Sequence, residues 1–248
     1  MKPASPRLQG AISATAIDPS AHVQLRAKIE LVSAPLGAAL GRIFARPDDL
    51  HQALVAHAIL IHQITRASGP LMEAALQACS LRPDDPAASG VAAYLERHIE
   101  EERHHDLWLL EDLESIRVAR ADVLSAPPPA AVAAMVGAQY YWIHHHDPVA
   151  LIGYMLMLEC NAPTLETLAD LKRRSKLPDR FFRTHRIHAE LDPDHQSDLL
   201  DVAVSLPLTA GRRQLVDASI MHTLERMADC LADLAERVAR RKPPVRAI

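Results

Sequence analysis

The chain has 248 residues, 49% of them hydrophobic and only 4% aromatic, with 8 glycines, and this composition favours helices over β-sheet. The length allows a full hydrophobic core. A formal charge of −4 and a pI near 6.4 give no reason to expect a nucleic-acid partner or an anionic membrane surface. The three cysteines are far apart, so they form neither a disulfide framework nor a Cys-x-x-Cys metal site.

Residues 1–20 are rich in Pro, Ser and Ala, and they predict a flexible N-terminal arm before a single helical domain over residues 21–248. No apolar segment of a secretory signal is present at the N-terminus, and the longest apolar run, Val149–Leu158, is too short to cross a bilayer. We therefore expect a cytoplasmic protein that acts on a small-molecule substrate, binds neither nucleic acid nor membrane, and could form a homodimer.

Helical periodicity dominates the chain from about His22 onward. It predicts helices over residues 22–45, 48–67, 70–80, 87–118, 130–145, 148–172, 179–205 and 208–241. Proline-containing segments such as Arg46-Pro-Asp-Asp separate the helices and place acidic residues in the next first turn. No strand alternates convincingly, and no internal repeat is present. The sequence thus predicts an all-α bundle of seven to eight helices.

One face of the fourth predicted helix carries metal-binding residue types: His98, Glu101, Glu102 and His105. At about 3.6 residues per turn, the four side chains fall within roughly 100° of arc. Apolar Leu109 continues the same stripe, so the polar side chains should point towards the core. Imidazoles and carboxylates sent inward need partners, because each otherwise loses its hydration without compensation. A metal ion would serve all of them together.

Simpler interpretations exist for the same residues. The acidic run Glu100–Glu102 could be a solvated face, and the histidines could be ordinary core residues. His104 points roughly 100° away from His105, although its spacing from Glu101 keeps it as a second choice. Which of the two neighbouring glutamates is a ligand stays open at this point.

A second inward row consists of His188, Asp192 and His195, which fall within roughly 60° of arc on a later helix. The third piece is Glu159, whose helical neighbours are apolar, so it should be buried. An unpaired ionised carboxylate in that position would cost several kcal/mol. The simpler alternatives are a surface pair of His188 with Asp192 and a salt bridge from Glu159 to an arginine.

Three helices therefore offer nitrogen and carboxylate ligands without thiolate, a set that suits iron or manganese better than zinc. Helical bundles hold two irons in carboxylate-rich sites of this type. No catalytic residue is predicted beyond the candidate metal ligands, which are Glu101, Glu102, His105, Glu159, His188, Asp192 and His195.

Three motifs between about residues 90 and 200 resemble the heme-oxygenase-like diiron oxidases and oxygenases, a family of iron-containing redox enzymes related in fold to thiaminase-type and quinone-cofactor-synthesis proteins. The motifs are His98-x2-Glu101-Glu102-x2-His105, Gly153-Tyr-x4-Glu159 and His188-x3-Asp192-x2-His195. The resemblance implies a heme-oxygenase-like bundle without heme, two Fe2+ ions as cofactor, and O2 as co-substrate. By position, the ligands it implies are Glu102, His105, Glu159, His188, Asp192 and His195.

The chain departs from the family pattern at one position. Where some members have a glutamate two turns before the first-helix histidine, this chain has His98. The resemblance implies a small amino-acid-like or fatty-acid-like substrate. An apolar cavity lining expected from Met155, Met157, Ile152 and Leu109 favours an aliphatic chain, although these residues would serve equally well in a core.

Three alternatives belong to other functional classes. A metal-free thiaminase-type or cofactor-biosynthesis enzyme of the same fold would need a nucleophile, for which Cys160 is the candidate thiol. A heme protein would need an axial histidine on the first helix and a glycine-rich distal helix, but His22 is poorly placed and glycines are sparse. A non-catalytic interaction protein would not need so complete a set of ligand types.

Overall fold

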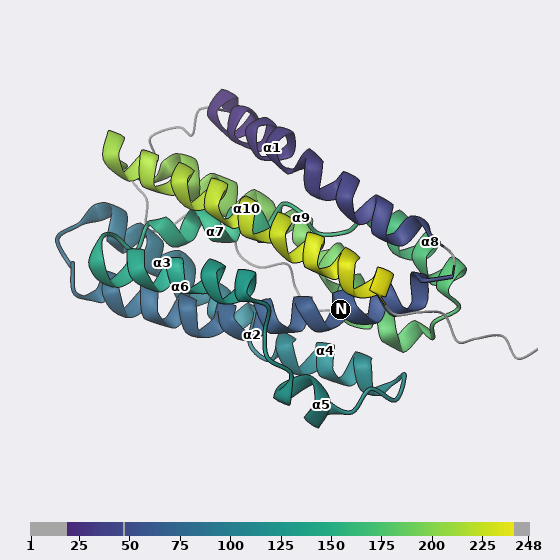
Figure 1. Cartoon of the computed structure of the whole chain (residues 1–248). Helices are drawn as coiled ribbons and strands as arrows, with labels where there is room; N and C mark the ends of the chain where they lie inside the picture. The colour runs from purple at the N-terminus through teal and green to yellow at the C-terminus, as the bar shows by residue number, and fades with distance from the viewer. Residues whose placement is uncertain (1–18, 47, 241–248) are drawn as a thin grey trace, which may run out of the picture.

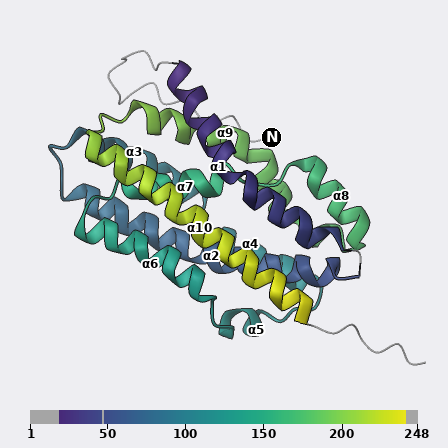
Figure 2. The same ribbon diagram turned by 45° about the horizontal axis from the view of Figure 1, so that its top comes forward.

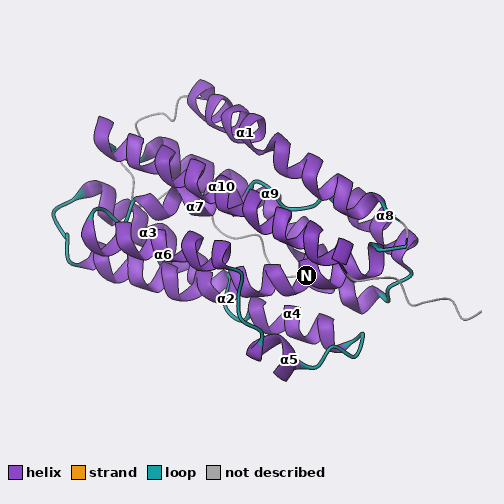
Figure 3. Ribbon diagram, viewed as in Figure 1, coloured by secondary structure: helices purple, strands orange, loops and turns teal. Residues whose placement is uncertain are grey.

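The computed structural model describes residues 19–46 and 48–240, without the side chains of residues 19 and 191–194. All regular structure in this part of the chain is helical (Figure 3). The elements are α1 (Pro19–Ala45), α2 (Leu50–Ser80), α3 (Pro86–Glu101), α4 (His105–Glu114), α5 (Arg120–Ser125), α6 (Ala130–His145), α7 (Ala150–Glu159), α8 (Leu165–Ser175), the 3-10 helix η1 (Asp179–Phe182), α9 (Arg183–Ser205) and α10 (Ala210–Arg240).

The all-α prediction is confirmed, but the described residues form ten α-helices instead of seven to eight. The predicted helices over 48–67 and 70–80 are one helix, α2, which continues through Pro70. The short helix α5 was not predicted. The predicted arm over residues 1–20 lies almost entirely outside the described residues, and α1 already includes Pro19.

The predicted helix over 148–172 is broken between α7 and α8, for local reasons. Pro163 disfavours helical conformation at the residue before it. The side chain of Asn161 donates to the Met157 carbonyl (2.7 Å) at the end of α7. The Thr164 hydroxyl accepts a hydrogen bond from the Thr167 amide (3.2 Å) and caps α8. The break leaves Glu159 as the last residue of α7.

Helix α7 is the centre of the bundle, because every residue from Ala150 to Met157 is buried. Helix α10 packs on α7 and also contacts α1, α2 and α6, while α2 contacts α3, α4 and α6 (Figures 1 and 2). The α7–α10 contact is close at Gly153, where a Cβ would lie 2.4 Å from the Val216 carbonyl oxygen. No helix of the described residues is long and apolar enough to cross a membrane.

A network of partly buried ion pairs joins the ends of several helices away from this centre. Arg212 of α10 contacts both carboxylate oxygens of Asp85 and donates from Nε to Asp147 Oδ2 at 2.9 Å. Arg82 donates to the same Asp147 oxygen at 2.9 Å. Asp85 also caps α3, because its Oδ1 accepts from the Ala87 amide at 3.0 Å. The network therefore fixes the start of α3 against α10.

We expect Asp85→Ala to reduce the free energy of unfolding at neutral pH by roughly 1–2 kcal/mol, through loss of both the cap and the contact with Arg212. The hydrogen bond from Arg212, together with those from two backbone amides, lowers the pKa of Asp85 from 3.8 to about 2, although partial burial opposes this shift. The stabilisation is therefore complete above pH 3.8 and is lost as the pH falls through 2. Urea unfolding across this range should give a flatter pH dependence for the variant. The exposed neighbour Asp84, replaced in the same way, should leave both stability and its pH dependence unchanged.

Candidate metal centre

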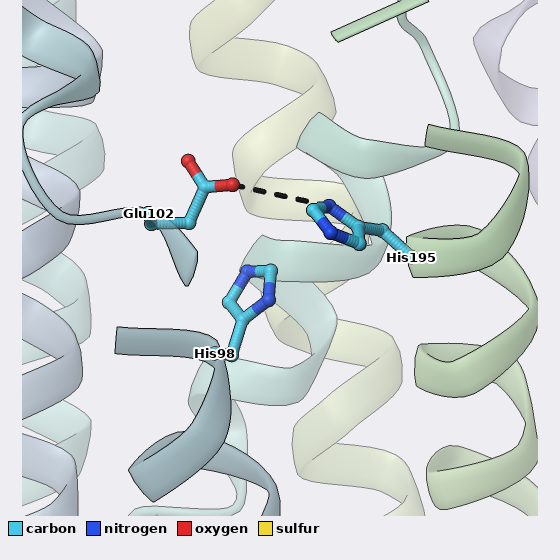
Figure 4. A group of neighbouring side chains, drawn as sticks. All are labelled: His98, Glu102 and His195. Carbon is cyan, nitrogen blue, oxygen red and sulfur yellow. Dashed lines mark ion pairs between the residues drawn. The ribbon is translucent and has the colours of Figure 1, made fainter. Parts of the chain in front are cut away.

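Side chains from α3, the α3–α4 connection, α4, α7 and α9 converge on one buried region. Two groups of three ligand types lie there, with one ligand atom of each residue within 4.8 Å of the others. The first group is His98, Glu102 and His195, and the second is Glu102, His105 and His188. Glu102 belongs to both groups. Figure 4 shows the first group: a dashed line joins the Glu102 carboxylate to His195, and the His98 ring lies below the two.

The backbone breaks at this point, so the prediction of one unbroken helix over 87–118 is wrong. Helix α3 ends at Glu101, the Glu102 amide donates to the His98 carbonyl (2.9 Å), and α4 begins at His105. His104 between them has a left-handed backbone with φ 73°. Three consecutive glutamates at the negative end of the α3 dipole weaken its last turn. The break places Glu102 and His105 towards α9, while the side chain of His104 is exposed and belongs to neither group.

The two carboxylate oxygens of Glu102 have different partners. Its Oε2 lies 2.8 Å from His105 Nδ1, whereas its buried Oε1 forms a 3.9 Å ion pair with His195 Nδ1, and neither of these two atoms has a hydrogen bond among the described residues. Burial opposes ionisation of Glu102, but the hydrogen bond to His105 and the charges of nearby histidines lower its pKa to about 2. An ionised carboxylate oxygen and an imidazole nitrogen that are buried without a hydrogen bond among the described residues fit a cation.

His98 lies inside the cluster, although its role was left open by the sequence. Only 2% of it is exposed, and its two ring nitrogens lie 3.7 Å from Glu101 and 3.7 Å from Glu159. Its ring stacks on Tyr94, with centroids 5.1 Å apart. Burial opposes protonation of His98, but the two carboxylates outweigh it and raise the pKa to about 9. The spacing of His98 from Glu102, one helical turn, is the signal that could have included it.

The remaining predicted ligands occupy different positions. Glu159 contacts one member of the cluster, His98. Glu101 lies at the edge of the cluster, 3.8 Å from His195 Nε2 and also 3.8 Å from Arg97. The ring of His105 packs edge-on against His188, with centroids 4.7 Å apart. The side chain of Asp192 lies outside the described residues, so its predicted role as a ligand stays a prediction.

Several contacts fix α9, which carries His188 and His195, against its neighbours. The buried Asp112 of α4 accepts a hydrogen bond from the Thr184 amide (2.8 Å) in the first turn of α9. Burial raises the pKa of this carboxyl, while the Thr184 hydrogen bond and the charge of Arg183 oppose the rise. Farther along α9, Gln196 donates to the Glu159 carbonyl (2.7 Å). These contacts hold α9, and with it His188 and His195, against α4 and α7.

A cavity of about 880 Å³ opens beside the cluster. Its wall includes His98, Glu102, Glu159 and His188 together with many apolar side chains of α1, α2, α7, α8 and α10. Of the apolar lining predicted from the sequence, Met155, Met157 and Leu109 line the cavity, whereas Ile152 does not. The volume falls within the roughly 300–1,000 Å³ typical of small-molecule sites.

Comparison with known proteins gives two kinds of match. A family model described as iron-containing redox enzyme matches residues 65–231. A domain of unknown function with a heme oxygenase-like fold from Shewanella denitrificans is similar in structure, with 19% identity, a TM-score of 0.68, and coverage of 91% of this chain and 95% of that chain. A TenA homolog from Pseudomonas syringae gives 13% identity, a TM-score of 0.65, and coverage of 92% and 98%. The curated proteins give no match.

At these identities the two structures show the fold alone, and they confirm the prediction of a heme-oxygenase-like bundle. The matched region of the family model begins in α2 and ends in α10, so it contains all the residues of the two groups around Glu102.

Proposed function

We propose that this chain, which belongs to the iron-containing redox enzyme family, is a nonheme diiron oxidase or oxygenase. The observation that carries the proposal is the position of Glu102, which belongs to two adjacent groups of ligand types. A carboxylate has two oxygens and can contact two cations at once. A single metal ion would need only one of the two groups.

The residues present fit two such ions. One would be held by His98, Glu102 and His195, and the other by Glu102, His105 and His188. Glu159, Glu101 and Asp192 are candidates to complete the two sets. Iron in its ferrous form would supply the electrons and the open coordination positions that O2 activation needs.

The protein's own side chains would position the substrate and exclude water. The apolar wall beside the centre suits the aliphatic part of a small fatty-acid-like or amino-acid-like substrate. Tyr94 and Trp108 pack on the rings of His98 and His105, with centroids 5.1 Å and 4.2 Å apart, and restrict how these imidazoles can turn. Outer contacts of this kind hold ligands in a fixed orientation.

The metal-free thiaminase-type alternative has less support. Its candidate nucleophile, Cys160, follows α7 directly but is not among the described residues that line the cavity. That alternative also gives no reason for a buried, ionised glutamate between four histidines.

The proposal is tested by anaerobic reconstitution with ferrous iron, metal counting after desalting, and rapid mixing with O2. We expect bound iron in the wild type and a change in visible absorbance after mixing. The double variant His195→Ala/Glu159→Ala should bind less iron and lose the absorbance change. Loss of neither property in the variant, or a wild type that takes up no iron, would contradict the proposal. His222→Ala, a change in α10 outside the candidate centre, is the matched control.

A further inference from the structure

The candidate metal centre is approached from the surface at a second place besides the cavity. An open hollow at the α3–α4 connection is lined by Arg97, Glu100, Glu101, Arg103, His104 and Trp108. Glu101 contacts His98 and His195 of the centre. Trp108 contacts the ring of His105. Neither Glu101 nor Trp108 is among the described residues that line the cavity, so the hollow reaches the centre through side chains that the cavity does not use.

The indole of Trp108 connects this hollow to a candidate ligand by direct ring contact. Its centroid lies 4.2 Å from that of the His105 imidazole, with the two planes inclined by 31°. Trp108 is half-buried, whereas His105 is only 2% exposed. Tyr94 packs on His98 in a similar way, but it is 1% exposed and does not reach the surface. Of these two aromatic rings, Trp108 is therefore the one that bridges a buried ligand and the solvent.

Contacts with α9 fix the position of this bridge. Arg183 of α9 donates to the Trp108 carbonyl at 3.2 Å and pairs with Glu111 of α4 at 3.0 Å. The His105 ring on which Trp108 packs also contacts the ring of His188, with centroids 4.7 Å apart. The indole thus has a defined place beside a ligand that faces both α4 and α9.

The proposed function requires a supply of electrons at the centre. Iron that O2 has oxidised becomes ferrous again only when a donor supplies electrons. Electrons move most readily along short paths of delocalised orbitals, and two π-systems in van der Waals contact provide such a path. An aliphatic side chain of similar size has no π-system. A donor at the hollow would also leave the cavity free for the substrate.

We propose that Trp108 is the route by which electrons from a water-soluble one-electron reductant reach the candidate centre. In each transfer the reductant loses one electron, which converts one Fe3+ to Fe2+, and no bond forms or breaks. The inference rests on the proposed function, because it names the electron supply of the same site. Substrate and O2 would use the cavity, while electrons would enter from the hollow.

The test compares two stopped-flow rates of the iron-loaded protein: anaerobic reduction of the ferric form by the methyl viologen radical cation, and oxidation of the ferrous form by O2. We expect Trp108→Leu to slow the reduction by about tenfold or more, the size of effect that outer residues commonly have on a metal centre. Iron content at saturating iron and the rate of oxidation by O2 should stay unchanged. Trp108→Phe keeps an aromatic ring and should retain most of the reduction rate. Trp142→Leu, which changes the other tryptophan, on α6, is the matched control.

Equal reduction rates in wild type and Trp108→Leu, with iron bound in both, would overturn this inference and leave the proposed function standing. Parallel slowing of reduction and oxidation would show a structural role for Trp108 and would overturn the inference as well. A wild type that takes up no iron would contradict the proposed function, and this inference with it. Should Trp108→Leu bind less iron than wild type, Trp108→Met takes its place, because the flexible methionine side chain fills irregular space. Loss of iron in both variants would overturn the inference.

Discussion

Replacing Glu102 by alanine is expected to abolish stoichiometric iron binding, because this carboxylate belongs to both groups of ligand types. The variant would leave His105 without its 2.8 Å partner and would leave four histidines with one fewer negative charge among them. Loss of a single group would remove one ion, but loss of the shared residue should remove both. Anaerobic titration with ferrous iron, followed by metal counting after desalting, measures the result.

The three consecutive glutamates provide a matched series for this experiment. Glu100 is exposed and paired with Arg103, so Glu100→Ala should bind as much iron as wild type. Glu101 lies at the edge of the cluster, near His98 and His195, so Glu101→Ala should weaken binding without abolishing it. Retention of two ions by a folded Glu102→Ala protein would show that the assignment of the shared carboxylate is wrong.

The second large effect is expected at Gly153, where α7 and α10 meet. A Cβ on this residue would lie 2.4 Å from the Val216 carbonyl oxygen and 2.8 Å from Ser219 Cβ. Both obstacles are fixed, because one is backbone and the other is the root of a buried side chain hydrogen-bonded to Gln139 (3.1 Å). Gly153→Ala should therefore lower the free energy of unfolding by roughly 2–4 kcal/mol, as measured by urea unfolding.

Gly137, on the exposed side of α6, is the control for this change. A Cβ there would meet nothing within 4 Å. Gly137→Ala should raise stability by about 0.5–1 kcal/mol, because glycine is a poor helix former. Equal effects of the two substitutions would mean that α7 and α10 are not in close contact at Gly153.

Helices that begin and end at local signals could be predicted closely from the sequence. Residues 130–145 were expected to be helical and form α6, because three prolines precede the helix and an Asp-Pro pair follows it. The break at Glu102–His104 could not be predicted in this way. Helical periodicity continues unbroken through that segment, and the left-handed residue is a histidine instead of a glycine.

The candidate centre likewise contains some contacts that could be predicted from the sequence and others that could not. Glu102, His105, His188 and His195 could be expected to meet, because their rows were predicted to face the core. The approach of Glu159 to His98, with 3.7 Å between Oε1 and Nε2, could not be predicted from either helix alone, because the two residues lie on α7 and α3. This contact depends on how the two helices pack, which no local pattern records.

The directions of the helices at the candidate centre have an electrostatic consequence. Helices α3 and α7 end there at Glu101 and Glu159, and α4 begins there at His105. Each helix end carries about half an elementary charge, negative at the C-terminus and positive at the N-terminus. Two negative ends and one positive end leave a surplus of about half a negative charge from the backbone alone. Such a field stabilises Fe3+ more than Fe2+, so it would lower the reduction potential of bound iron and make the ferrous form a stronger reductant.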